Sequence, residues 1–393
     1  MPPNKQRTMK DFQSPQQRKM YNFLLLLIIA ATMGLQGWRT LFNNFAVDQV
    51  GINGFQVGVI QSFREIPGFL TFLVVYLLLI FKEHKLSIYS VMLTGLGVML
   101  TGFFPTYLGI IFTTFLFSTG FHYFETTNKS LTLQYYSSQQ SPIILGKQQS
   151  WKAITNIGVG ILILITSRFL NLKWNFVLLG AAVIILSIIA LFLSPVDRSL
   201  PIQKSHIVVK KKYWLFYALN LLSGARRQVF VVFAIFMLVE KYHFSVMMIT
   251  LLFIFNNIIT YFTAPYIGKG INRYGERTVL TLEYSFMIIV FLGYSFVQNA
   301  WIIAALYIVD NLFFSCSISI NTFFQKIGDK TDIAPSMAAG FAINHIAAVF
   351  IPVIGGLLWI IDYQIPFLIG VFLAIVSLFL VQLIPNAIRK ANN

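Results

Sequence analysis

The sequence has few charged residues and few residues that build disulfides or metal centres. Charged side chains make up 11% of its 393 residues, whereas a soluble globular domain carries about 25%. Cys316 is the single cysteine, which excludes an internal disulfide framework. The five histidines are His84, His122, His206, His243 and His345. They are scattered without metal-ligand spacing, so we expect no metal site and no cofactor. An ordinary soluble protein is therefore excluded.

The residues that are abundant are apolar. Hydrophobic residues make up 57% of the chain, and the mean hydropathy is +0.73. About 20 apolar residues suffice for a helix to cross a bilayer, and twelve stretches come near that length. We place them at 20–46, 54–81, 87–104, 107–129, 144–167, 175–194, 213–239, 245–268, 278–296, 300–325, 334–358 and 363–385. The expected fold class is an all-α membrane protein with twelve transmembrane helices.

The second half of the chain repeats the first. Arg39–Ala46 (RTLFNNFA) returns 188 residues later as Arg227–Ala234 (RQVFVVFA), and Ala153–Ile157 returns as Ala342–Ile346 at an offset of 189. We therefore expect two pseudo-symmetric six-helix bundles. Transporters built from such repeats place a substrate site between the halves, near the bilayer midplane. The expected order is a tail, the first bundle, a basic linker, the second bundle and a second tail, at 1–19, 20–194, 195–212, 213–385 and 386–393.

The net charge of +16 is unevenly distributed. One set of loops holds only Arg168, Lys173 and Lys241. The tails, the linker and the other loops hold most of the basic residues, including Lys5, Arg7, Lys10, Arg198, Lys204 and Lys210–Lys212. Cytoplasmic loops of membrane proteins carry such an excess, so we expect both termini in the cytoplasm and the chain in a bacterial cytoplasmic (inner) membrane. This distribution argues against nucleic-acid binding. The apolar run after residue 19 also exceeds the core of a cleaved signal peptide, about 7–15 residues.

A short motif supports a family resemblance. The segment from Gly268 to Arg277 reads GKGINRYGER, and Gly268 and Gly275 suit a tight turn and close helix approach. In this motif, in its two halves and in its basic linker, the chain resembles the major facilitator superfamily, whose loops between helices 2 and 3, and often 8 and 9, read G-x-x-x-D-R-x-G-R-R. Asn272 replaces the usual aspartate, Glu276 replaces a basic residue, and the first copy near 81–85 lacks the glycines. The resemblance implies a cytoplasmic gate formed by Gly268, Asn272, Arg273, Gly275 and Arg277.

Several charges lie deep within the expected helices. Each costs roughly 2.5–3.5 kcal/mol in a membrane, and such residues usually mark function. The group consists of Arg39, Arg64, Glu65, Glu125, Arg226, Arg227 and Asp310. Because it holds four arginines and three carboxylates, pairing cannot neutralise all of the positive charge. The candidate binding or coupling site also includes polar residues at similar depth: His122, Asn257, Asn311, Asn344 and His345.

The arginines have two interpretations. Arg226 and Arg227 lie about 14 residues into the expected helix 213–239, roughly 20 Å deep at 1.5 Å per residue. Arg227 matches Arg39 in the repeat, whereas Arg226 has no counterpart. The planar guanidinium suits carboxylate or phosphate, so these arginines either clamp an anionic substrate or pair with carboxylates and join helices. An Arg39–Glu65 pair, or a network centred on Arg64 and Glu65, is the structural alternative.

The remaining candidates also leave alternatives open. Asp310 and Asn311 lie in the expected helix 300–325, which lines the cavity in the family that the chain resembles, and Asp310 is either a proton-coupling group or an arginine partner. His122 and Glu125 are three residues apart and share a helix face, where they either relay protons or form a pair at the cavity. The buried amides and imidazole either join helices or bind polar substrate groups: Asn257, Asn344 and His345.

We therefore expect a monomeric secondary active transporter that moves a small polar solute by alternating access. The arginine excess favours an anion, and coupling to protons is one option. The alternatives are a proton-driven exporter of amphipathic compounds and, in a different class, a membrane sensor or scaffold that does not transport. An enzyme is not expected because no Ser/His/Asp or metal constellation has suitable spacing. The expected partners are the substrate, protons if they are coupled, and the lipid bilayer.

Overall fold

Helices account for the regular structure in the described part of the chain. The computed structural model describes residues 14–52, 54–193, 195, 197, 199–244 and 246–392, and these residues form no strand. Four basic residues that the sequence places on the cytoplasmic side lie outside the described residues, together with most of the expected tail 1–19: Lys5, Arg7, Lys10 and Arg198.

The first half contains six helical segments. The second of them is interrupted by a 3-10 turn at Leu70–Leu73, three residues after the proline of Pro67-Gly68. The six segments are α1 (Pro15–Asn44), α2 with α3 (Gly54–Phe69 and Val74–Leu77), α4 (Glu83–Thr101), α5 (Tyr107–Tyr135), α6 (Ser141–Thr166) and α7 (Leu172–Leu191).

The second half contributes six more segments and a terminal helix. They are α8 with α9 (Trp214–Gln228 and Ile235–Glu240), α10 (Val246–Phe296), which covers two expected spans, α11 with α12 (Ala300–Phe314 and Ile318–Ile327), α13 (Ile333–Ile361), α14 (Gln364–Val381) and the short α15 (Ile384–Asn392). In the described part of the chain, seven helices are both long enough and apolar enough to cross a membrane. Segments such as α5 are less apolar because they carry many buried polar residues, yet their lengths match the expected twelve spans.

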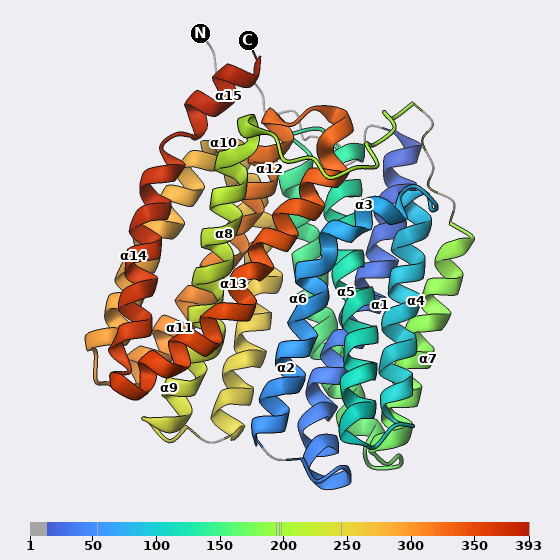
Figure 1. Ribbon diagram of the computed structural model, residues 1–393, viewed down its shortest axis with the longest axis vertical. Coiled ribbons are helices and arrows are strands. Elements are labelled where there is room, and N and C mark those ends of the chain that lie inside the picture. The colour runs from blue at the N-terminus through green and yellow to red at the C-terminus, as the bar shows by residue number, and fades with distance from the viewer. Residues whose placement is uncertain are drawn as a thin grey trace.

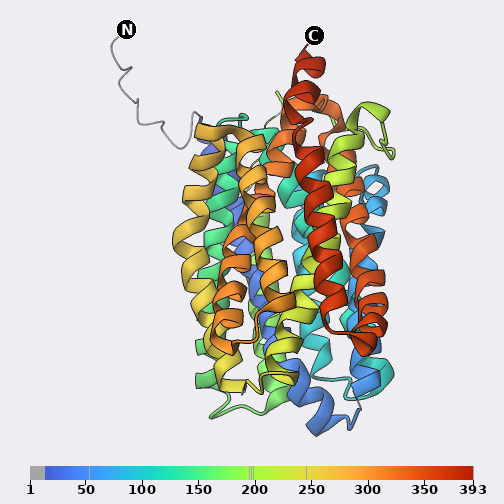
Figure 2. The same cartoon turned by 90° about the vertical axis from the view of Figure 1, so that its left-hand side faces the viewer.

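The two halves form adjacent groups of helices. Helices α1–α7, blue to green, lie beside α8–α15, yellow-green to red (Figure 1). The start of α1 and the helix α15 lie at the same end of the molecule, as the rotated view also shows (Figure 2). We call this the terminal end. Each half has its own aromatic core, exemplified by Trp38 stacked on Phe42 at 4.3 Å and Phe230 stacked on Tyr307 at 4.9 Å.

Each half of the described chain contains a π-helical turn. A π-helical turn follows Arg39 at Phe45–Gln49, and another follows Arg227 at Val229–Ala234. π-Helical turns are rare and occur frequently at functional sites. The first turn follows α1 and the second follows α8, and at the repeat offset of 188 residues the two overlap at only two positions, so they lie near each other in the repeat but are not equivalent.

Gly275 produces the sharp bend inside α10. Two separate helices are expected here, at 245–268 and 278–296, but helical structure continues across the intervening residues and only Gly275 departs from it, with φ 79° and ψ 160°. Residues other than glycine almost never occupy this backbone region. The motif identified in the sequence is therefore mostly helical, and its second glycine supplies the turn between two spans.

Replacing Gly275 with alanine should destabilise the fold. The added Cβ strains a backbone that only glycine adopts readily, so we expect the free energy of unfolding to fall by about 1–3 kcal/mol. The control is Gly270→Ala in the same motif, where an added Cβ meets no atom within 4 Å and the free energy should stay unchanged or rise by up to about 1 kcal/mol. Thermal unfolding in detergent would measure both. Equal effects of the two substitutions would contradict the assignment.

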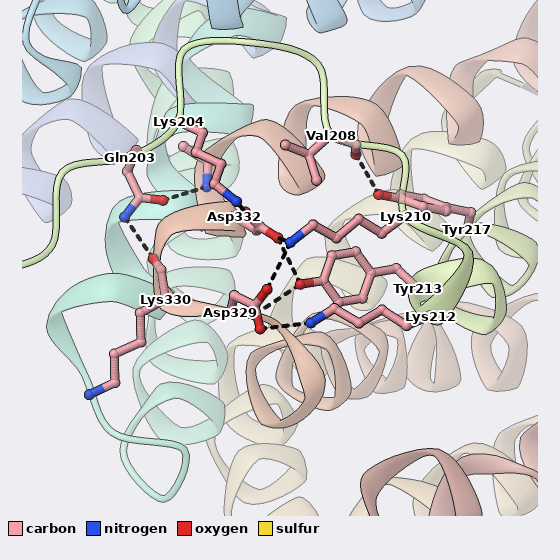
Figure 3. A network of polar contacts seen from close by, with 11 residues as sticks. Gln203, Lys204, Val208, Lys210, Lys212, Tyr213, Tyr217, Asp329, Lys330 and Asp332 are labelled. Atoms are coloured by element: carbon pink, nitrogen blue, oxygen red, sulfur yellow. Dashed lines mark hydrogen bonds and ion pairs between the residues drawn. The ribbon is translucent and has the colours of Figure 1, made fainter. Parts of the chain in front are cut away.

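The basic linker is fastened to the second half by ion pairs, which we call the linker clasp (Figure 3). Lys204 lies 2.7 Å from Asp332, and Lys210 contacts both Asp332 and Asp329. Lys212 lies 2.7 Å from Asp329. The Asp332 side chain is fully buried, whereas that of Asp329 is 46% exposed. Both carboxylates lie between α12 and α13, so the clasp holds the linker against the terminal end of the second half.

The linker clasp should make stability depend on acid pH. Hydrogen bonds from Lys210 and Lys212 hold the pKa of Asp329 well below its usual value. Burial alone would raise the pKa of Asp332, but hydrogen bonds from Lys204 and Lys210 outweigh burial and lower it. A depressed folded-state pKa stabilises the fold above the unfolded-state pKa of about 3.9, and this stabilisation is lost as the pH falls below that value.

An Asp332→Asn variant should therefore unfold more easily than the wild type at neutral pH, by roughly 1–3 kcal/mol, because two lysines lose a buried acceptor. The difference between the two proteins should be constant near neutral pH and shrink as the pH falls from about 5 to about 2. Melting temperatures across this range would measure it. Asp362→Asn is the control, since Asp362 is exposed and the amide oxygen can still accept from Gln364. A constant difference across the range would refute the effect.

Candidate functional site

The halves are joined at the terminal end and at mid-depth. Gln325 of α12 donates to the carbonyls of Leu133 and Tyr136 at 2.7 and 2.6 Å. Nearer mid-depth, Ser150 of α6 donates to the carbonyl of Tyr261 on α10 at 2.6 Å. These bonds close the molecule at its terminal end.

The expected gate motif takes part in this closure. Gly268 packs so closely on α6 that an added Cβ would lie 2.3 Å from the carbonyl oxygen of Pro142, and Asn272 donates to the carbonyl of Gln139. Arg277 donates instead to Gln382 within the second half, at 2.8 Å, and Arg273 is exposed. Gly268 and Asn272 therefore touch the opposite half, whereas the two arginines of the motif do not bond to it in the described structure.

Two contacts at mid-depth are related by the repeat. Asn156 of α6 donates to Asn257 of α10 at 2.9 Å. On the other side, the ring of His345 on α13 lies directly against Gly68 of α2, where an added Cβ would be 2.3 Å from the ring. The same offset of 189 residues relates Asn156 to His345 and Gly68 to Asn257. The pseudo-symmetric helix pairs α6–α10 and α2–α13 thus meet through matching positions.

A polar cluster around Glu65 lies at the α2–α13 contact. Arg64 donates to Oε1 of Glu65 at 2.7 Å, and Nε2 of His345 lies 3.9 Å from Oε2 of the same carboxylate. The rings of His122 and His345 meet edge to face, with centroids 4.8 Å apart. Arg227 lies within electrostatic range of Glu65, and so does Arg39. Six of the residues singled out from the sequence therefore come together here: Arg39, Arg64, Glu65, His122, Arg227 and His345.

His122 and Glu125 each bond to another partner in the described structure. Nδ1 of His122 lies 3.0 Å from the carbonyl of Ser118, one turn earlier on α5. Glu125 bonds instead to Lys152 of α6 at 2.6 Å. A residue three positions along a helix turns through about 300° and shares a face only approximately, so neighbouring helices decide which partner each side chain reaches.

A second cluster, around Arg226, lies within the second half. Arg226 lies 3.4 Å from Glu283 of α10, both are buried, and the guanidinium stacks on Tyr284 at 4.3 Å. Asp310 of α11 lines the same small cavity of about 20 Å³ as Arg226 and Glu283. Buried oxygens of Glu283 and Asp310 have no hydrogen-bond partner among the described residues. Arg227 lines this cavity as well, so two guanidiniums and two carboxylates surround it.

A second polar cavity adjoins the small one, shares Arg227 with it and contacts both halves. Its volume is about 80 Å³. Lys129 of α5 and Arg227 of α8 line it, together with the amides Asn220, Asn321 and Asn344, the hydroxyls Ser223 and Ser317, and apolar side chains from α8, α11, α12 and α13. No carboxylate is among the described residues that line it. Asn344 also donates to the carbonyl of Asn220 at 3.0 Å.

The other predicted amides join helices. Asn257 receives the bond from Asn156 across the halves, and Asn311 donates to Thr260 at 3.2 Å, which ties α11 to α10. Asn344 alone of these three also lines the central cavity.

Sequence reasoning missed Lys129 and Glu283. The expected helix ended at residue 129, which put Lys129 near the membrane surface, but α5 continues to Tyr135 and carries Lys129 into the central cavity. Glu283 is not among the candidates named from the sequence, where it lies five residues into the expected helix 278–296. The residues after 129 are polar, and for that reason the expected helix ended there. The structure shows that α5 continues through them to Tyr135.

The comparisons with known proteins agree with this architecture. Residues 22–339 match the model of the Major Facilitator Superfamily. No curated protein shows significant sequence similarity to the chain. Among solved structures, a Major Facilitator Superfamily transporter, FucP, in the outward conformation has a TM-score of 0.68 and 14% identity, covering 93% of this chain and 98% of that chain.

Two further structures are similar in fold. The human organic anion transporter MFSD10 (TETRAN) has a TM-score of 0.69 and 11% identity, covering 94% of this chain and 100% of that chain. A bacterial homologue of the iron transporter ferroportin, in the outward-facing state with soaked iron, has a TM-score of 0.70 and 14% identity, covering 95% and 99%. With the family match across most of its length, the chain belongs to the Major Facilitator Superfamily and is a multi-pass membrane transport protein.

Proposed function

We propose that this transporter carries a small anionic solute. The observation that carries the proposal is the central cavity, where Lys129 and Arg227 face the same space and no carboxylate lines it among the described residues. Ammonium and guanidinium groups offer only donors, and Arg227 presents a planar fork suited to carboxylate or phosphate. The neighbouring amides and hydroxyls can hydrogen-bond the rest of a small polar molecule.

The surrounding charge supports an anion. Three arginines, Arg39, Arg64 and Arg227, lie around Glu65, and Arg64 already occupies one of its oxygens. Guanidiniums therefore outnumber carboxylates around Glu65, and unpaired charge is costly within a membrane. A bound anion would supply the missing negative charge, which is why binding is favourable at this position.

The Arg226 cluster supports coupling to protons. Glu283 and Asp310 line one small cavity with Arg226 and Arg227, and one buried oxygen of each carboxylate has no hydrogen-bond partner among the described residues. A proton taken up by one of these carboxylates would weaken its attraction for the arginines beside it, while an anion would offset the positive charge in the central cavity. Joint uptake of the two would move little net charge across the membrane. Asp310, on α11, is the proposed coupling residue, with Glu283 beside it.

Alternating access is the proposed transport cycle. In the described structure the halves meet at the terminal end, whereas Arg39, Thr40 and Asn43, toward the other end of α1, are exposed. This conformation suits entry of solute from the side away from the termini. With the basic tails and linker in the cytoplasm, that side is the exterior, and the halves would rock about the central cavity to release solute inside.

A ligand panel tests the proposal. Purified protein is heated with small organic acids, phosphorylated sugars, amino acids and lipophilic cations, at about pH 5.5 and about pH 7.5. A ligand at a hundredfold excess over its dissociation constant adds about 2.7 kcal/mol of stability, so an anionic substrate should raise the melting temperature clearly. We expect a rise with members of the anion group, larger at the lower pH. A rise with lipophilic cations alone would refute the proposal and favour an exporter of amphipathic compounds.

A further inference from the structure

We propose that Glu65, His122 and His345 form a site for a divalent transition-metal ion that bridges the two halves of the protein. One potential ligand atom from each residue lies within 4.8 Å of the others. Both histidines are buried, and the Glu65 side chain is only 17% exposed. The histidines are 223 positions apart in the sequence, so only the packing of α5 against α13 brings them together.

Both imidazoles are oriented for metal binding. Nδ1 of His122 lies 3.0 Å from the carbonyl of Ser118, and Nδ1 of His345 lies 2.9 Å from the carbonyl of Phe341. Nδ1 of His122 also lies 3.1 Å from Oγ of Ser118, but that hydroxyl donates its hydrogen to the carbonyl of Arg64. All of these oxygens therefore accept from the rings, so each Nδ1 carries the ring hydrogen and each Nε2 keeps its lone pair. Metal-ligating histidines almost always donate their other ring N–H to a carbonyl, carboxylate or water. Here two backbone carbonyls fix the required tautomer in both rings.

The carboxylate completes a three-ligand set. Arg64 bonds to Oε1 of Glu65, while Oε2 lies 3.9 Å from Nε2 of His345. Zinc binds nitrogen and oxygen at about 2.0–2.2 Å, which places the ligand atoms of a tetrahedral ion about 3.4 Å apart. Side-chain rotations that move each ligand atom by about 1 Å would bring the three atoms to this separation around an ion. Two imidazoles and one carboxylate suit Zn²⁺, Ni²⁺ or Co²⁺ better than Mg²⁺ or Ca²⁺.

The nearby arginines, including Arg64 bonded to Glu65 itself, favour an anionic fourth ligand. Arg39 and Arg227 lie within electrostatic range of Glu65 and would repel a bare dication. A metal ion that carries an anionic fourth ligand, such as hydroxide or a carboxylate, lowers that repulsion. Three protein ligands with an open fourth position are also the arrangement of zinc sites that bind an exogenous group.

The ion would lock the present arrangement of the halves. Glu65 and His122 belong to α2 and α5 of the first half, whereas His345 belongs to α13 of the second. The close approach of α2 and α13 depends on Gly68, because an added Cβ would lie 2.3 Å from the His345 ring. If the halves separated here, as alternating access requires, the ion would lose a ligand. Bound metal should therefore favour this conformation and slow transport.

Metal titration of purified protein tests the site. The protein carries an affinity tag free of histidine and is treated with chelator before Co²⁺ or Zn²⁺ is added. We expect one ion per chain, a visible Co²⁺ spectrum of tetrahedral type, and a higher melting temperature with Zn²⁺. His122→Gln and His345→Gln should each weaken binding by more than about 100-fold, since outer-shell partners alone contribute about 10–100-fold. Gly68→Ala should also weaken it by displacing His345.

A matched control changes the three remaining histidines together, as His84→Gln, His206→Gln and His243→Asn. Asparagine is chosen at position 243 because the backbone there has φ 55°, which asparagine tolerates. This variant should bind metal as the wild type does. Binding that survives His122→Gln with His345→Gln but is lost in the control would overturn the proposal. If the site variants do not fold, the wild type still decides: less than one ion per chain, or an octahedral Co²⁺ spectrum, would also overturn it.

Discussion

Arg226→Met is expected to lower the free energy of unfolding by roughly 3–5 kcal/mol, because it leaves a buried carboxylate without its cation. Arg226 and Glu283 are both buried with their charged atoms 3.4 Å apart, and Asp310 lines the same cavity. Loss of the guanidinium leaves two carboxylates together in a membrane environment. Denaturant or thermal unfolding in detergent would measure the change.

The double variant Arg226→Met with Glu283→Met should recover part of that loss, since replacing both members of a buried ion pair by apolar groups is often close to neutral. The exposed Arg168 provides the control, and Arg168→Met should change the free energy by no more than about 0.5 kcal/mol. Additive losses from the two single substitutions would show that Arg226 and Glu283 do not stabilise each other.

Arg227→Gln is expected to reduce the apparent affinity for the transported anion by roughly 10–150-fold. A hydrogen bond to a charged group contributes about 1.5–3 kcal/mol, and Arg227 is one of the two cations that line the central cavity. Uptake of radiolabelled solute into proteoliposomes, measured over a range of concentrations, would give the change. The melting temperature of the unliganded variant would separate a binding defect from a folding defect.

Arg227→Lys is the matched variant. It keeps the charge but loses the planar fork, so its affinity should lie between those of the wild type and Arg227→Gln. Arg168→Gln should transport as the wild type does, because this residue is exposed and distant in sequence from every cavity residue. Unchanged uptake by Arg227→Gln would mean that Arg227 serves only to hold helices around Glu65, and the anionic substrate would then need another site.

The linker clasp and the bend in α10 show two kinds of feature that the sequence predicts only in part. The linker was identified by its basic residues, but its partners Asp329 and Asp332 lie more than a hundred residues away and have no local signal. Gly275 was identified as a turn residue, yet its neighbours stay helical. The glycine pattern fixed where the chain bends, whereas the length of helix around it depends on packing against α6.

The sequence by itself determined the fold class of this protein. Long apolar stretches need a bilayer, and in a bilayer the backbone must satisfy its own hydrogen bonds, so helices follow directly from composition. The repeat of Arg39 in Arg227 indicated two related halves, and the depth of the charged residues indicated the candidate site. These features depend on neighbours along the chain, which is why they could be predicted.

Only the tertiary structure decided the partners of those charges. His122 and His345 were scattered in the sequence and meet at Glu65, Glu125 bonds to Lys152 instead of His122, and Glu283 pairs with Arg226. Each partner comes from a different helix, and its position depends on how helices rotate and shift against one another. A shift of one residue turns a side chain by about 100°, so contacts between helices are set by packing of the whole bundle and not by the pattern of any one segment.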